Sequence, residues 1–130
     1  MMPHLIIEYT ANLEPQVDMP SICNALRLEM IATGVFPTAG VRVRAVCVDT
    51  FAMADADPKN SFVHMQIRMG TGRDLETRQR AGEAIYGVAR TEFAKQLETG
   101  FFALSLEINE INSDTSWKLN TVRGRLALKN

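Results

Sequence analysis

Residues 63–74 read VHMQIRMGTGRD, and this stretch decides the class of fold. Its first seven side chains alternate between apolar and polar, which is the period of a half-buried β-strand. Gly70–Thr71–Gly72 then predicts a turn, and Asp74 is a preferred N-cap residue for a helix. We therefore expect a strand, a turn and a helix in direct succession.

The segment after Asp74 carries apolar residues at the spacing of one helical face. These residues are Gly82, Ile85, Tyr86, Ala89, Phe93 and Leu97. Gly100 is predicted to end this helix, and a second alternating strand follows from Phe102 to Ile108. Residues 61–110 are thus predicted to form one β-α-β unit.

Residues 3–50 follow the same plan. A short strand is expected from His4 to Tyr9, a helix from Asp18 to the stop at Gly34, and another strand from Val41 to Thr50. A helix-length connection between two strands predicts parallel, right-handed pairing. Two such units, with both helices on one face of a sheet, make an α/β sandwich in a single domain over residues 1–130.

The segment 45–48 (Ala-Val-Cys-Val) is apolar on both faces of its strand. Such a strand is typical of a sheet that is covered on both sides, whereas the two helices cover only one. We therefore expect a homo-oligomer in which the uncovered faces pack together. The tail, residues 112–130, has weak periodicity, and Trp117 and Leu119 are expected to add an edge strand or to reach a neighbouring subunit.

Composition and charge exclude several classes of protein. Fourteen basic and fifteen acidic residues give a net charge of −1, which argues against nucleic-acid binding. No run approaches the roughly 18 apolar residues of a membrane span, and no secretory signal is recognised. Cys23 and Cys47 lack the spacing of metal ligands, so we interpret them as buried thiols of a cytoplasmic protein.

The common catalytic and phosphate-binding motifs are absent, and arginines stand out instead. Arg42 and Arg44 share one strand face, and Arg73 directly precedes a predicted helix N-terminus. Guanidinium groups and helical N–H groups together favour a ligand with more than one carboxylate. His64 lies on the polar face of its strand, and we interpret it as an ordinary hydrogen-bonded residue. No metal site is expected.

Pro3 becomes a candidate base if translation starts at Met2 and this methionine is removed. The proline would then carry a free secondary amine, and α-amino groups titrate at about 7.7–8.0 in model peptides. An apolar pocket beside guanidinium groups disfavours the protonated form and lowers that pKa. Such a base is suited to moving a proton on carbon.

The chain resembles the 5-carboxymethyl-2-hydroxymuconate Δ-isomerase family of the tautomerase superfamily from Pro3 to about Val122. Taken in order, several short blocks make the resemblance specific, although each alone is weak. The blocks are Pro3–His4, residues 33–37 (TGVFP), 39–44 (AGVRVR), 48–50 (VDT), 53–55 (MAD), 62–65 (FVHM), 70–76 (GTGRDLE), 103–105 (ALS) and 107–108 (EI).

This resemblance implies a mixed four-stranded sheet with two helices on one face, in a trimer whose sheets surround a central axis. It implies a cofactor-free isomerase with Pro3 as general base and with Arg42 and Arg73 as carboxylate ligands; Arg44 is a further candidate. The implied substrate is an unsaturated hydroxylated di- or tricarboxylate of bacterial homoprotocatechuate (4-hydroxyphenylacetate) catabolism.

Two positions depart from the family pattern. Phe51 stands where a tryptophan is expected, and Met1–Met2 precede the proline. We hypothesise that the functional start is Met2, because a retained methionine would leave Pro3 with an amide nitrogen. Two alternatives stay open, namely a related tautomerase that acts on another enol dicarboxylate, and a non-catalytic trimer of the same fold that binds a ligand or a partner protein.

Overall fold

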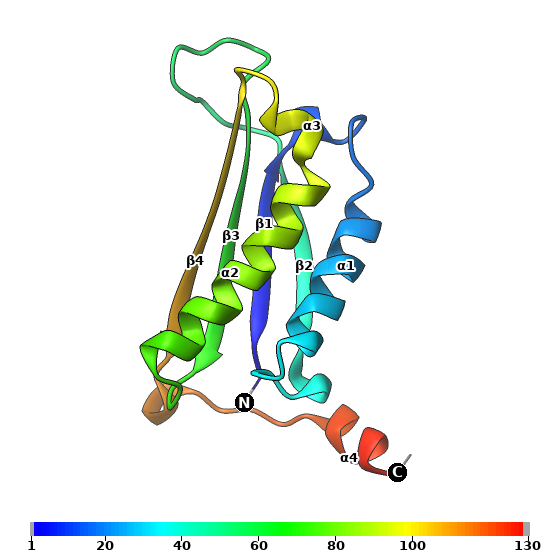
Figure 1. Ribbon diagram of the computed structural model, residues 1–130, viewed down its shortest axis with the longest axis vertical. Helices are drawn as coiled ribbons and strands as arrows, with labels where there is room; N and C mark the ends of the chain where they lie inside the picture. The colour runs from blue at the N-terminus through cyan, green and yellow to red at the C-terminus, as the bar shows by residue number, and fades with distance from the viewer. Residues whose placement is uncertain (1, 129–130) are drawn as a thin grey trace.

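The computed structural model describes residues 2–128, so Met1, which we expect to be absent from the functional chain, lies outside the described residues. Four strands form one sheet in the order β2-β1-β3-β4 (Figure 1). They are β1 (His4–Thr10), β2 (Arg42–Val48), β3 (Ser61–Gly70) and β4 (Phe102–Ile111). β1 pairs with β2 and β3 with β4 in parallel, while β1 and β3 are antiparallel. The predicted mixed sheet built from two parallel units is confirmed.

Both long helices, α1 (Met19–Ala32) and α2 (Leu75–Glu92), lie on the same face of the sheet (Figure 1). Each begins after an aspartate whose side chain accepts a hydrogen bond from a backbone N–H of the first turn. Asp18 accepts from Ser21 at 3.2 Å, and Asp74 accepts from Thr77 at 2.8 Å. The predicted caps are therefore confirmed, and they stabilise the two helix starts.

The core lies between this helical layer and the sheet. Its fully buried side chains come from alternate strand positions and from one face of each helix, as the periodicity predicts. They include Leu5, Ile7, Leu26, Met30, Met65, Ile67, Ile85 and Phe93.

The apolar face of the second helix ends earlier than predicted. Leu97 is 41% exposed, so its expected place in the buried stripe is wrong. The backbone of Phe93 leaves helical geometry at φ −104° and ψ 21°, and a separate short helix, α3 (Ala94–Leu97), follows. Because this break turns the chain, Phe93 is the last stripe residue that reaches the core.

The tail forms no edge strand within the described residues, so that alternative is wrong. After β4 it makes a 3₁₀ turn (Ser113–Thr115) and then a short helix, α4 (Thr121–Ala127). In Figure 1 it crosses below the start of β1 towards the start of β2. Trp117 and Leu119 are almost fully exposed. The described 3₁₀ turns include two more, Ala11–Leu13 and Thr38–Gly40.

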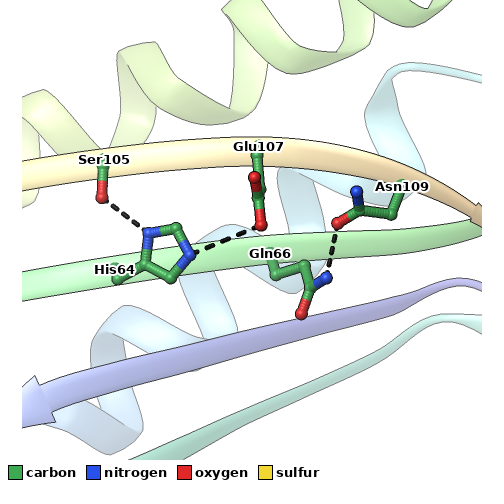
Figure 2. A network of polar contacts seen from close by, with 5 residues as sticks. All are labelled: His64, Gln66, Ser105, Glu107 and Asn109. Carbon is green, nitrogen blue, oxygen red and sulfur yellow. Dashed lines mark hydrogen bonds and ion pairs between the residues drawn. The ribbon is translucent and has the colours of Figure 1, made fainter.

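The sheet face opposite the helices is uncovered in the single chain. Val46 is 48% exposed there, which leaves the two-sided apolar segment of β2 without the cover that we expect. Further along this face, the Nδ1 atom of His64 lies 2.7 Å from the hydroxyl oxygen of Ser105. Figure 2 shows these two side chains facing each other across β3 and β4. The His64 interpretation therefore agrees with its surroundings. Among residues 2–128, no helix is long and apolar enough to cross a membrane.

Candidate active site

The amino-terminal end of the sheet brings Pro3 and Arg42 together. Pro3 is buried directly before β1, where a residue without an N–H breaks no ladder hydrogen bond. Its carbonyl accepts a hydrogen bond from the Arg42 N–H at 3.3 Å. The parallel register then sets His4 opposite Arg42. Pairing of β1 with β2 thus brings the backbone of Arg42 next to Pro3 and sets the Arg42 side chain on the same sheet face as His4.

A cavity of about 320 Å³ opens at this end of the sheet. Met2 and His4, which flank Pro3, line it together with Arg42. Its other walls come from the end of β3 and from the tail, through Gly70, Ile111, Ser113, Ser116, Trp117 and Lys118. The side chain of Met2 reaches Arg42, whose Nη2 lies 2.9 Å from the methionine sulfur. In this form of the chain, Met2 occupies the space beside the candidate base.

His4 is held neutral by its surroundings. Partial burial lowers its pKa from 6.5, and the nearby guanidinium groups of Arg44, Arg42 and Arg68 lower it further. The Nη1 group of Arg44 lies 3.1 Å from His4 Nδ1. Since a guanidinium can only donate, Nδ1 is the acceptor and the ring proton is on Nε2. Arg44 therefore binds His4 in this chain, and the carboxylate contact for which it was a candidate stays a prediction.

This arrangement predicts that the protein becomes less stable as the pH falls. The lowered pKa means that the unfolded chain binds a proton at His4 more readily than the folded chain does. The His4 contribution to the free energy of unfolding is thus present above pH 6.5 and is lost as the pH falls towards the folded pKa. We expect His4→Asn to reduce the loss of stability between about pH 7.5 and pH 5 in urea denaturation. Equal pH profiles for the wild-type protein and His4→Asn would contradict the assignment.

Arg73 lines a different cavity from Arg42 within the chain. Its Nη2 donates a hydrogen bond to the carbonyl of Val35 at 3.0 Å. Its cavity, of about 570 Å³, lies between the end of α1 and the start of α2. Arg73 follows the end of β3 that lies beside the start of β1, but it does not line the Arg42 cavity.

Phe51 also lies away from the amino-terminal cavity. It follows the carboxyl end of β2, whereas Pro3 precedes the amino end of the parallel strand β1. Its ring meets that of Phe62 edge-on, with centroids 6.1 Å apart. Within one chain, phenylalanine in place of the expected tryptophan therefore affects a region other than the Pro3 site.

Two features of the described residues concern metal binding and thiol reactivity. No cluster of three or more His, Cys, Asp or Glu residues is arranged to hold a metal ion. Cys23 and Cys47 are free and half-buried rather than fully buried. Burial raises the pKa of the Cys23 thiol, which disfavours the reactive thiolate.

Local sequence patterns indicate no binding role for Trp117 and Lys118, which line the cavity. They are about 75 residues further along the chain than Arg42, and no local periodicity connects the two regions. The only sequence signal was a tryptophan in a tail of weak periodicity.

Known proteins show to which family the chain belongs. The family model for 5-carboxymethyl-2-hydroxymuconate isomerase matches residues 3–126. The 5-carboxymethyl-2-hydroxymuconate Delta-isomerase of Escherichia coli is 40% identical over 121 residues, which cover 93% of this chain and 96% of that protein.

Solved structures agree with this family match. A 5-carboxymethyl-2-hydroxymuconate isomerase from Deinococcus radiodurans R1 superposes with a TM-score of 0.90 at 35% identity, covering 96% of this chain and 94% of that one. A macrophage migration inhibitory factor-like protein from Entamoeba histolytica shares only the fold, with a TM-score of 0.62 at 11% identity over 92% of this chain and 97% of that one. The chain therefore belongs to the 5-carboxymethyl-2-hydroxymuconate isomerase family.

Proposed function

We propose that this chain, an isomerase that shifts a carbon–carbon double bond, converts 5-carboxymethyl-2-hydroxymuconate to its unsaturated 2-oxo isomer. The observation that carries the proposal is the position of Pro3, which is buried at the start of β1 with Arg42 on the adjoining strand. The second candidate is a related enzyme of the same fold that acts on another enol dicarboxylate. Arginines bind carboxylates, but they do not by themselves select the length of the substrate's carbon chain.

The proposed base is the ring nitrogen of Pro3 after removal of Met2. Its buried position beside Arg42 disfavours a protonated amine, so the nitrogen is neutral at a lower pH than an exposed amino group. It accepts the proton of the dienol 2-hydroxyl. The electrons move along the conjugated chain, and the same proton is returned to a carbon further along it. No redox change occurs, and the reaction requires no cofactor.

Arg42 is proposed to bind the substrate beside this base and to stabilise the negative charge that develops on its oxygen. A fixed cation in a partly enclosed site needs little reorganisation during the reaction. Arg73 remains a proposed carboxylate ligand. Because it lines a different cavity in its own chain, we propose that it acts at the site of a neighbouring subunit.

We further propose a cytoplasmic homotrimer with the uncovered sheet faces around a common axis. The exposed Val46 on that face supports an assembly, since burial of such apolar surface favours association. The proposed setting is bacterial catabolism of homoprotocatechuate, whose ring cleavage yields a substrate of this chemical class.

The experiment that tests the function compares two purified proteins, one that begins at Pro3 and one that keeps Met2, with intact mass establishing each amino terminus. Loss of the conjugated dienol absorbance measures turnover. Rapid isomerisation by the Pro3 form alone supports the proposal. Binding of the substrate by both forms without turnover would favour the non-catalytic alternative.

A further inference from the structure

A segment after β4, residues 112–120, is held across the amino-terminal cavity, and we name it the crossing segment. At its start, the Asn112 side chain accepts a hydrogen bond from the Asp114 N–H at 3.0 Å. At its end, Asn120 donates to the carbonyl of Ala39 at 2.9 Å and also accepts from Val122 at 3.0 Å. Figure 1 shows the segment passing close to the amino terminus. Since the segment follows β4 directly and its end is bonded to Ala39, Trp117 and Lys118 are positioned at the wall of the cavity rather than at a loose chain end.

The space on both sides of Lys118 is lined by cations. Lys118 and Met2 line the cavity that holds Arg42, and they also line a second cavity of about 230 Å³. The second cavity adds Arg123 from α4. None of the described residues that line these two cavities is an aspartate or a glutamate. Three cations thus face a space without a compensating carboxylate, which favours an anionic ligand.

Met2 and Lys118 line both the Arg42 cavity and the Arg123 cavity, so the two cavities adjoin at these residues. Removal of Met2, which the proposed catalytic form requires, takes away one of these two shared residues. We expect the resulting space to run past Arg42 and Lys118 towards Arg123. An elongated ligand with several carboxylates matches it better than a compact anion with one.

We propose that the crossing segment is a specificity-determining wall of the active site. Lys118 binds a substrate carboxylate remote from Pro3, Arg123 supports a second one, and Trp117 packs against the unsaturated chain. This inference rests on the proposed function, since it assigns carboxylate ligands for that same site. Lys118 and Arg123 would thus provide cations at this site from the same chain, whereas Arg73 of that chain lines a different cavity.

Trp117 makes a direct test possible, because it is the one tryptophan of the sequence. Its fluorescence reports binding at this wall without any turnover. The titrations use protein that begins at Pro3 and three unreactive ligands, namely propane-1,2,3-tricarboxylate, glutarate and butyrate. We expect the tricarboxylate to change the fluorescence and to bind most tightly. A charge-assisted hydrogen bond accounts for roughly tenfold in affinity, so Lys118→Met should weaken tricarboxylate binding about tenfold and leave butyrate binding nearly unchanged.

Three matched variants complete the test. Lys118→Arg keeps the charge and should restore most of the tricarboxylate affinity, while Arg123→Met should weaken it by a smaller factor. Lys95→Met removes a lysine from α3, far from this cavity, and should have no effect. The inference is overturned if no carboxylate changes the fluorescence, or if Lys118→Met weakens the binding of tricarboxylate and butyrate equally. It is also overturned if Lys118→Met behaves like Lys95→Met.

The result of this binding test can be distinguished from the result of the isomerase test. If Lys118-dependent tricarboxylate binding is found but the Pro3 form does not isomerise the dienol, the isomerase proposal fails and the binding wall stands. If isomerisation is found without any dependence of tricarboxylate binding on Lys118, the isomerase stands and this inference fails.

Discussion

A chain that keeps Met2 is expected to isomerise the dienol with a kcat lower by about 10²–10⁴-fold than the chain that begins at Pro3, which is the usual contribution of a positioned general base. The physical reason is that the Pro3 nitrogen becomes an amide when Met2 is attached, and its lone pair is then delocalised into the carbonyl. Met2 also places its sulfur against Arg42, at 2.9 Å from Nη2, and so fills the space that the substrate requires.

The pH dependence of the Pro3 form gives an internal check on this expectation. The neutral amine is the active base, so kcat/KM should rise with pH and level off above the pKa of the free enzyme's amine. That pKa should lie below the roughly 7.7–8.0 of an exposed α-amino group. The folding stability of both forms should be compared in urea, since a loss of activity caused by unfolding would not concern the base. Equal kcat values for the two forms would show that proline is not the base.

Arg42→Ala is expected to lower kcat by about 10²–10³-fold, the effect that loss of one charge-stabilising donor has in other enzymes. In the proposed reaction, negative charge grows on the substrate oxygen as the proton leaves, and Arg42 is the arginine whose backbone N–H bonds the Pro3 carbonyl. An interaction that strengthens in the transition state affects kcat more than KM. A variant that raises KM and leaves kcat unchanged would instead identify Arg42 as a ligand for a ground-state carboxylate.

Arg27→Ala is the matched control for this experiment. Arg27 is an exposed arginine of α1 whose side chain bonds only Asn24 among the described contacts. Its removal changes the net charge by the same amount as Arg42→Ala and leaves the cavity intact. A similar loss of kcat in both variants would assign the effect to the overall charge rather than to Arg42.

Local pattern predicted most of the fold. The alternation in β3 and the aspartate caps before α1 and α2 depend on side chains a few residues apart, and the structure confirms each of them. The end of the buried face of α2 was predicted wrongly, because the break in the helix at Phe93 contains neither glycine nor proline. Packing of Phe93 into the core against Phe102, with ring centroids 5.6 Å apart, accompanies this break.

Local sequence by itself determined the strands, the helix starts and the β-α-β plan, because backbone geometry and the burial of one face act over a few residues. The neighbourhood of Pro3 was decided only by the tertiary structure. Parallel pairing brings Arg42 to the start of β1, the tail returns Lys118 to the same end, and the bond from Arg73 to Val35 holds that arginine in a different cavity. These contacts join residues about 40 to 110 positions apart, and their formation depends on the packing of the whole domain rather than on any local pattern.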